Sequence, residues 1–219
     1  QGYFVLATRG GRIKRVHLDE FAGVRPSGVI AMSLEAGDQM CWAKYTDGDQ
    51  DIILATANGQ SIRFHEHRVR AMGRQAGGVL SMKLAEDDAI IGMDTVRAED
   101  THVLVVTQRG YSKRTPLEEY RTRGRNGYGI RTLDLTDKTG PVVAMRCINP
   151  KDDILVLTAD GIVLRSNLEQ IRDTGRIAQG VKLIDLSEDD YVVGIAIMEG
   201  AADSGNGSPD GDLPDTMLG

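Results

Sequence analysis

The sequence has few of the features that mark secreted, metal-stabilised or membrane proteins. Its 219 residues include only two cysteines, Cys41 and Cys147, which lie 106 positions apart. This is the spacing of neither a disulfide framework nor a metal knuckle. No run approaches the roughly 18 apolar residues of a membrane-spanning helix, and the N-terminus lacks the basic and apolar regions of a secretory signal. We therefore predict a soluble cytoplasmic protein with two reduced thiols and no membrane partner.

Aromatic residues are also scarce, and acidic residues outnumber basic ones. Aromatics make up 5% of the chain, and 26 Lys and Arg stand against 32 Asp and Glu, for a formal net charge of −6. An acidic balance of this kind disfavours nucleic acid as a partner when it is averaged over the whole chain. In contrast, 41% of the residues are hydrophobic, which is enough to bury a core in one large domain or two small ones and excludes disorder throughout.

A sequence element of about 50 residues occurs four times along the chain. Each copy has a Thr-x-x-Gly pattern after an apolar run, and successive threonines are separated by 48, 51 and 51 residues. The threonine, the glycine and an arginine four positions later are Thr8, Gly11, Arg15; Thr56, Gly59, Arg63; Thr107, Gly110, Arg114; and Thr158, Gly161, Arg165. Three further positions recur in each copy: a large side chain, a second glycine that precedes a β-branched residue, and a leucine. In chain order they are Phe21, Gly28, Leu34; Val69, Gly78, Leu84; Tyr120, Gly129, Leu135; and Ile171, Gly180, Leu186. Marks in constant register indicate a repeat architecture.

Each repeat is predicted to form four short strands. Residues 52–56 and 61–65 flank Asn58-Gly59, and residues 155–158 and 162–166 flank Asp160-Gly161, which are dipeptides typical of tight hairpin turns. Further strands are expected at 79–84 and 89–96, and helix is expected only as one turn near 116–120. The fold class is therefore all-β, and four-stranded units of this length favour the blades of a propeller-like ring over a stacked solenoid.

Basic residues concentrate in one part of every repeat. The segments from the first hairpin turn to the neighbourhood of the second glycine are 9–25, 57–76, 108–131 and 159–176, and together they hold 19 Lys or Arg against 8 Asp or Glu, a formal +11. The rest of the chain holds 7 against 24, a formal −17. Equivalent positions in a ring of blades fall on one surface, so the pattern predicts a basic rim.

This rim is a candidate binding surface for a bent polyanion. The alternative is that the segments are ordinary solvated loops. Recurrence of the bias in four loops favours a continuous track, and the scarcity of aromatic stacking platforms favours duplex DNA over single strands. The predicted DNA-binding residues are Arg12, Lys14, Arg15, Arg25, Arg63, Arg70, Arg74, Lys113, Arg114, Arg121, Arg123, Arg125, Arg131, Arg165 and Arg176.

The repeats resemble a known family, the C-terminal DNA-wrapping domain of the DNA gyrase A subunit, which the topoisomerase IV A subunit shares in weaker form. The resemblance covers about residues 3–198 and is carried by Leu54 to Gly59, Val69 to Gly73, Gly110 to Thr115 with Glu119-Tyr120, and Gly175 to Val181. It implies a β-pinwheel, a propeller variant whose neighbouring blades exchange a strand. It also implies that DNA is wrapped around the basic rim and presented for ATP-driven strand passage and negative supercoiling.

The resemblance further implies the setting in which such a domain works. Its partners would be double-stranded DNA, the N-terminal cleavage core of gyrase A, which carries the catalytic tyrosine, and the gyrase B subunit, in a bacterial, nucleoid-associated location. The family's Gln-Arg-Arg-Gly-Gly-x-Gly box is absent as written, and only Arg125, Gly127 and Gly129 match it in the stretch from Arg123 to Gly129. We therefore expect residues 1–198 to be a pinwheel lacking its first blades, followed by a disordered acidic tail at 199–219.

No catalytic centre, cofactor or metal is expected in this chain. His65-Glu66-His67 places two imidazoles on one face of a strand, but the sequence offers no third ligand beside them. No Gly-rich loop ends in Lys-Ser or Lys-Thr for ATP, and the tyrosines fall at structural positions of the repeat. Two alternatives to a gyrase domain remain: a topoisomerase IV A-subunit domain, and a protein-interaction propeller, which would carry aromatic and Met hot spots on its loops.

Overall fold

The computed structural model describes residues 2–198, and the predicted acidic tail at 199–219 lies outside the described residues. The described residues form four antiparallel sheets. The first contains β3 (Met40–Thr46), β1 (Tyr3–Thr8), β2 (Arg12–His17) and β6 (Val79–Leu80) in spatial order. The second contains β7 (Ile90–Thr95), β4 (Asp51–Thr56), β5 (Gln60–His65) and β10 (Ile130–Arg131). The third contains β11 (Val142–Ile148), β8 (His102–Thr107), β9 (Tyr111–Pro116) and β14 (Val181–Lys182), and the fourth contains β15 (Val192–Met198), β12 (Asp153–Thr158) and β13 (Val163–Asn167).

Helical structure in the described part of the chain is limited to single 3-10 turns. These turns are η1 (Leu18–Phe21), η2 (Glu66–Arg68), η3 (Leu117–Glu119) and η4 (Leu168–Gln170). The turn expected near 116–120 is confirmed, and the other three occupy the same place in the other repeats. Within the described residues, no helix has the length and apolar character needed to cross a membrane. The predicted all-β fold of propeller-like blades is therefore confirmed.

The Thr-x-x-Gly pattern forms the hairpin turn of each blade. The buried Thr56 side chain accepts a hydrogen bond from the Gln60 N–H at 3.2 Å, and Thr8, Thr107 and Thr158 accept the equivalent bond in their own repeats. Gly59 closes the turn with a φ of 75°, a left-handed conformation that favours glycine. The hairpins predicted at 52–65 and 155–166 match β4–β5 and β12–β13 to within two residues at each end.

Neighbouring blades exchange a strand, as the family resemblance implies. β6 belongs to the second repeat but pairs with β2 of the first, and β10 and β14 pair in the same way with β5 and β9. The expectation of a strand over 79–84 is wrong in length, because only two residues pair before Met82 turns into the core. The second glycine permits the close approach: a Cβ on Gly129 would lie 2.3 Å from the Ser61 carbonyl oxygen.

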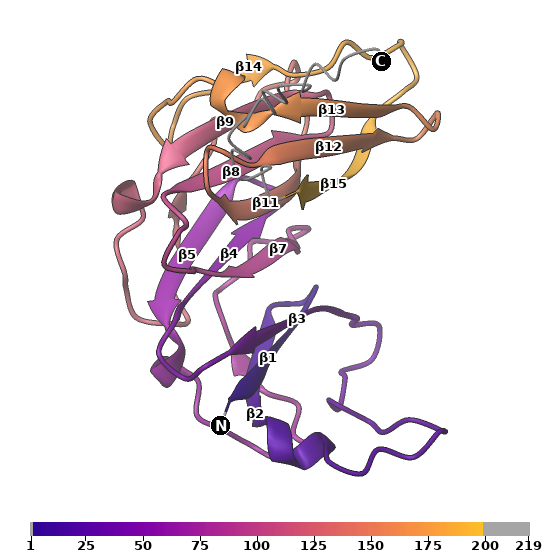
Figure 1. The fold of residues 1–219 in the computed structure, drawn as a ribbon, viewed down its shortest axis with the longest axis vertical. Helices are drawn as coiled ribbons and strands as arrows, with labels where there is room; N and C mark the ends of the chain where they lie inside the picture. The colour runs from indigo at the N-terminus through magenta and orange to yellow at the C-terminus, as the bar shows by residue number, and fades with distance from the viewer. Residues whose placement is uncertain (1, 199–219) are drawn as a thin grey trace, which may run out of the picture.

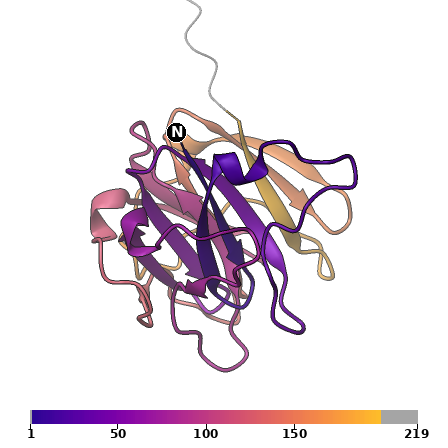
Figure 2. The same ribbon diagram turned by 90° about the horizontal axis from the view of Figure 1, so that it is seen from below.

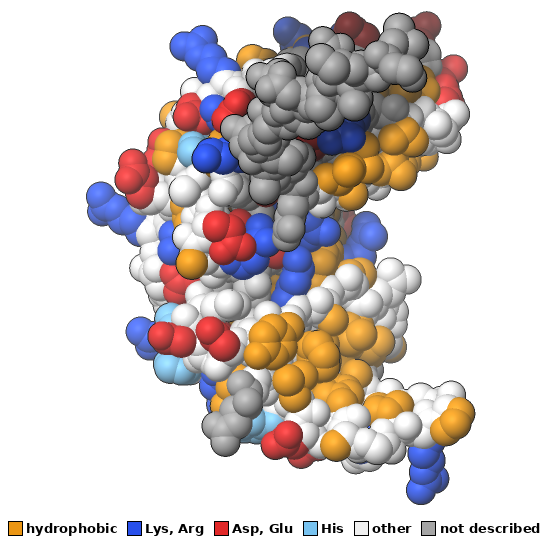
Figure 3. Space-filling view, viewed as in Figure 1, with side chains coloured by type: hydrophobic (Ala, Val, Ile, Leu, Met, Phe, Trp, Pro, Cys, Tyr) orange, Lys and Arg blue, Asp and Glu red, His pale blue; other side chains and the backbone are white. Residues whose placement is uncertain are grey.

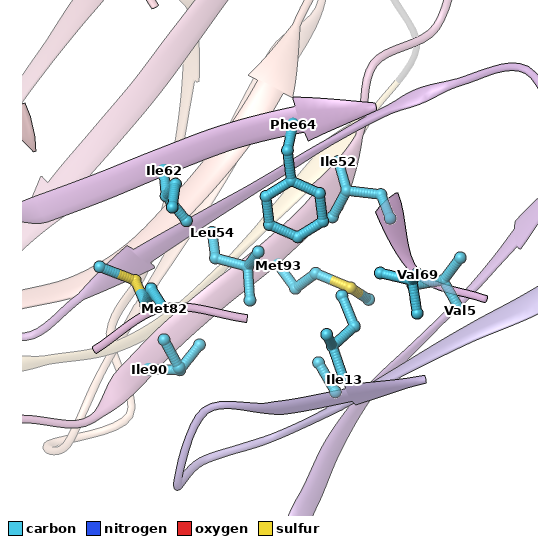
Figure 4. Close-up of a cluster of buried hydrophobic side chains, with 11 residues drawn as sticks. Val5, Ile13, Ile52, Leu54, Ile62, Phe64, Val69, Met82, Ile90 and Met93 are labelled. Atoms are coloured by element: carbon cyan, nitrogen blue, oxygen red, sulfur yellow. The ribbon is translucent and has the colours of Figure 1, made fainter. Parts of the chain in front are cut away.

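The hydrophobic core lies between consecutive blades. One cluster combines Val5, Ala7 and Ile13 of the first blade with residues of the second, including Ile52 and Phe64 (Figure 4). Two equivalent clusters join the second blade to the third and the third to the fourth. Each blade therefore buries a face against each neighbour, whereas Leu6, Val16 and Met32 form a smaller cluster within the first repeat.

The blades form an open arc. β3 contacts β7, β7 contacts β11, and β11 contacts β15, whereas the first and last sheets lie at opposite ends of the molecule (Figure 1). The view along the long axis shows the blades stacked behind one another (Figure 2). At the two ends, strand exchange is incomplete among the described residues: β13 has no partner on its outer side, and Ile30, the counterpart of Leu80, is 68% exposed.

Candidate nucleic-acid interface

Each basic segment contains the second strand of its blade's hairpin. Every sheet runs from a strand near its neighbours (β3, β7, β11 or β15) through the first hairpin strand to the second (β2, β5, β9 or β13). In the first three sheets the short exchanged strand (β6, β10 or β14) lies beyond it, and each basic segment contains one of the second hairpin strands. Lys and Arg side chains occur at intervals along the left edge of the molecule, with Asp and Glu among them, on the side where β5 and β9 lie (Figure 3). Sheet topology thus places the four segments on successive outer edges of the arc.

Two of the predicted DNA-binding lysines are fully buried. The Lys14 Nζ donates hydrogen bonds to the carbonyl oxygens of Gly73, Arg74 and Ala76 at 2.9, 2.6 and 3.0 Å. Lys113 makes the equivalent contacts between the third and fourth repeats, with the carbonyls of Gly175 and Arg176. Burial lowers the pKa of Lys14 and lowers that of Lys113 to about 7. These lysines hold the loop of the following repeat and do not face solvent, so they are not part of the interface.

The arginines four positions after the first glycine connect blades. Arg15, only 8% exposed, pairs at 3.1 Å with Glu66 of the next repeat, a carboxylate that is itself fully buried. Arg63 pairs with Asp51 at 2.8 Å and donates to the carbonyl oxygens of Leu117 and Tyr120 in the next repeat. Their regular spacing in the sequence therefore reflects blade packing.

Of the last two arginines of this series, Arg114 also connects two blades, whereas Arg165 does not. Arg114 pairs across the third and fourth repeats with Asp173 at 2.5 Å. Arg165 has no following repeat among the described residues and pairs at 2.6 Å with Asp153 of its own sheet, leaving its side chain 61% exposed. Arg165 therefore keeps access to solvent that Arg15, Arg63 and Arg114 lack.

The arginines before the second glycine anchor each loop to the preceding blade. Arg74, Arg125 and Arg176 donate to the carbonyl oxygens of Ile30, Leu80 and Arg131, which are equivalent residues of successive repeats. Because a guanidinium has five N–H donors, this contact leaves others free for a ligand. The stretch from Arg123 to Gly129, which partly matches the family's Gln-Arg-Arg-Gly-Gly-x-Gly box, lies in the loop that this Arg125 hydrogen bond anchors.

The predicted residues that remain exposed form the candidate interface. Arg25, Arg70, Arg121 and Arg123 are exposed, and within residues 2–198 none of the four takes part in an ion pair. Arg131 is exposed and pairs with Asp134 at 3.3 Å, and half-buried Arg12 pairs with Glu35. Arg121, Arg123 and Arg176 also line one surface hollow together with Glu118, Glu119 and Ile130. Three guanidinium groups and two carboxylates line this hollow, so its formal charge is +1.

Several exposed cations were not among the predicted contacts. Arg9, Arg68, Arg109 and Arg172 lie in the basic segments, and Arg172 is the fourth-repeat equivalent of Arg70 and Arg121. Lys83 and Lys138 lie outside those segments, each 5.4 Å from the ring centroid of a tyrosine, Tyr128 and Tyr111 respectively. The four arginines contributed to the charge count of the basic segments, whereas the two lysines lie in connections outside those segments and gave no such signal.

The structure also brings a third ligand to the histidine pair. Asp49, 16 residues before His65, places its carboxylate 3.1 Å from the His65 Nε2, and the ligand atoms of Asp49, His65 and His67 lie within 4.8 Å of one another. The expectation that His65 and His67 have no third ligand is therefore wrong. Glu66, the residue between them, is buried on the other side with Arg15 and Thr46.

Comparison with known proteins places this architecture in one family. The family described as "DNA gyrase C-terminal domain, beta-propeller" matches residues 2–40, 50–97, 101–149 and 152–197, one match for each repeat. The A subunit of DNA gyrase from Deinococcus deserti is 39% identical over 196 residues, and that from Staphylococcus epidermidis is 37% identical over 197 residues. These alignments cover 88% and 90% of this chain but 24% and 22% of the relatives, so the chain spans about a quarter of their length.

Solved structures show the same fold. A DNA gyrase A C-terminal domain superposes with a TM-score of 0.82 at 26% identity, over 90% of this chain and 66% of that one. The C-terminal domain of a DNA topoisomerase IV superposes with a TM-score of 0.86 at 28% identity, over 90% of this chain and 62% of that one. With four family matches, one on each blade, and the strand exchange between the blades, this chain belongs to the DNA gyrase C-terminal domain family.

Proposed function

We propose that this chain binds duplex DNA along the outer edges of its blades and bends it, as the non-catalytic wrapping part of a type II topoisomerase. The observation that carries the proposal is the set of exposed arginines on successive blades that have no carboxylate partner: Arg25, Arg70, Arg121 and Arg123. Phosphate contacts of this kind bind DNA with little sequence preference. A curved series of such contacts favours a bent duplex.

Salt dependence of DNA binding tests the contact surface. Six of the predicted cations and four further arginines of the basic segments are exposed. If about six to ten of them meet phosphates, the logarithm of the binding constant should fall with the logarithm of salt concentration with a slope of about −5 to −9. Fluorescence anisotropy of a labelled duplex, measured from about 50 to 200 mM salt, gives this slope. A slope shallower than about −3 would refute the interface.

A matched pair of charge reversals tests its position. Arg123→Glu changes an exposed cation of the interface, and Lys151→Glu changes an exposed cation outside the basic segments. We expect Arg123→Glu to weaken DNA binding about tenfold at low salt and Lys151→Glu to change it less than about twofold. Equal effects would mean that the chain attracts DNA only through diffuse charge.

Bending requires a separate measurement. Curving a site of 20–30 bp by 40–90° costs roughly 1–6 kcal/mol, so contacts from several blades must act together. Affinity should therefore rise with duplex length until the arc is filled, and energy transfer between the ends of a duplex of about 40 bp should increase on binding. An unchanged end-to-end distance at saturation would leave DNA binding without wrapping.

The reaction of the whole protein is also part of the proposal. We infer that the chain acts with an N-terminal cleavage core and the gyrase B subunit in ATP-dependent negative supercoiling, in the bacterial cytoplasm. The similarity to a topoisomerase IV domain supports decatenation as the second candidate. Assay of the reconstituted holoenzyme on relaxed closed circles and on linked circles distinguishes the two, because only a gyrase introduces negative supercoils.

A further inference from the structure

Two imidazoles and a carboxylate meet where the second blade's hairpin ends. His65 is the last residue of β5, His67 lies in η2, and Asp49 lies in the connection between β3 and β4. The His65 and His67 ring centroids are 4.5 Å apart, and the Asp49 Oδ1 is 3.1 Å from the His65 Nε2. All three ligand atoms lie within 4.8 Å of one another. Nitrogen ligands from two histidines with one carboxylate are a donor set that suits Zn²⁺.

The spacing of the ligand atoms fits a bound ion. Two ligands at about 2.0–2.1 Å from a tetrahedral ion lie about 3.3 Å apart, close to the 3.1 Å between Asp49 and His65. The His67 ligand atom lies within 4.8 Å of the other two, and the residue is exposed. The Asp49 side chain is 86% exposed and that of His65 is 32% exposed, so an ion can enter and water can fill the remaining position.

The backbone holds two of the three ligands before any ion binds. His65 pairs with Asp51 in the β4–β5 ladder. Asp49 is ordered by a turn in which its own N–H donates to the Asp47 carboxylate at 3.1 Å, after Gly48 with a φ of 108°. A site with ordered ligands loses little conformational entropy on binding.

The histidine pair is not required by the architecture of the repeat. The residues equivalent to His65 and His67 in the other repeats are His17 and Asp19, Pro116 and Glu118, and Asn167 and Glu169. Only the second repeat combines two imidazoles with a carboxylate from the preceding connection within ligand distance, among the described residues.

The present role of His65 does not prevent it from binding an ion. Its Nδ1 accepts a hydrogen bond from the His67 N–H at 3.2 Å and so caps η2, as Asn167 caps η4. An ion on Nε2 moves the imidazole proton to Nδ1 and removes this cap. The turns η1 and η3 form with no side-chain cap, so the fold tolerates the loss.

We propose that Asp49, His65 and His67 bind one divalent transition-metal ion of the Zn²⁺ class, with water completing the shell. The ion joins the connection before β4 to the turn after β5 and so stabilises the second blade when it is bound. The site is separate from the DNA-binding proposal, because none of its three ligands is an interface cation.

Calorimetric titration with Zn²⁺ alone, on residues 1–219 without a histidine tag, tests the site. The titration is run in a Cys41→Ser background, since Cys41 is the exposed thiol and Cys147 is buried. We expect one ion per chain. His65→Asn keeps a capping side chain of the kind found at Asn167 and should weaken Zn²⁺ binding at least tenfold, and His67→Gln should do the same.

His17→Asn is the matched control, since His17 occupies the equivalent position of the first repeat. We expect it to bind Zn²⁺ like the parent chain. Circular dichroism of each variant verifies that the fold is retained. Unchanged affinity in His65→Asn, an equal loss in His17→Asn, or no binding at about 1 mM Zn²⁺ would each overturn the proposal.

Discussion

Strand exchange should depend on the second glycine of each repeat wherever a neighbouring blade is present. Gly129 and Gly28 are equivalent residues with nearly equal φ values of 77° and 76°. An alanine Cβ at Gly129 would lie 2.3 Å from the Ser61 carbonyl oxygen, whereas one at Gly28 meets nothing within 4 Å. The two alanine variants therefore share the backbone strain and differ in the clash.

The structure sets the expected magnitudes. Left-handed backbone costs alanine about 1–2 kcal/mol, and about 0.4–1 kcal/mol is recovered because alanine restricts the unfolded chain, so Gly28→Ala should lower the free energy of unfolding by about 1 kcal/mol. In Gly129→Ala the clash with backbone displaces β10 from β5, with loss of the pairing of Ile130 and Arg131. Overpacking of about 1–3 kcal/mol and lost hydrogen bonds of about 0.5–1.5 kcal/mol each raise the total to about 3–5 kcal/mol.

Urea unfolding followed by circular dichroism measures both variants. Hydrogen exchange at Ile130 should also become faster in Gly129→Ala, because its pairing is lost. In Gly28→Ala the same amide should be unaffected. If the two variants lose equal stability, the close approach of β10 to β5 does not limit the fold, and the reasoning is refuted.

Three further predictions concern buried charges and thiols. Burial lowers the pKa of Lys113 from its ordinary value of 10.5 to about 7, so between these pH values the unfolded chain binds more protons than the folded one. The free energy of unfolding should therefore rise by up to about 1.4 kcal/mol per pH unit above pH 7. Urea unfolding of Lys113→Leu between pH 7 and 8.5 should lack this part of the rise. Arg63→Met should lower the free energy of unfolding by about 2–3 kcal/mol and Arg165→Met by less than about 1, since only Arg63 joins two repeats; equal losses in urea unfolding would contradict this. Native protein should react with a maleimide at Cys41 alone and at both thiols in urea, because Cys147 is buried and its pKa is raised by desolvation; two fast thiols in the native state would contradict this.

The repeat, the hairpins and the fold class could be predicted from the sequence because they depend on local patterns. The threonine that bonds four residues ahead and the glycine with positive φ act within one turn, so each leaves its mark at a fixed spacing. The uneven distribution of charge between segments was also readable, since it needs only the order of residues along the chain.

Which basic residues face solvent was decided by packing between blades. Lys14 and Arg25 lie in the same basic segment, yet Lys14 is buried against the carbonyls of a loop about 60 residues later and Arg25 is exposed. An arginine repeated at constant spacing can belong to a ligand-binding surface or to an ion pair between blades, and the spacing alone does not distinguish the two. The difference arises from contacts between repeats, which a one-dimensional pattern does not record.

The meeting of Asp49 with His65 and His67 shows the same limit. Asp49 belongs to the connection before β4, and the antiparallel hairpin returns the chain to it 16 residues later. The sequence around the two histidines does not reveal Asp49 as a third candidate ligand, because only the folded hairpin brings Asp49 close to them. Local sequence patterns were enough to predict which strands and turns form. Which side chains these elements bury, expose or gather into a site depends on burial and on distances between residues far apart in the chain, which only the folded structure shows.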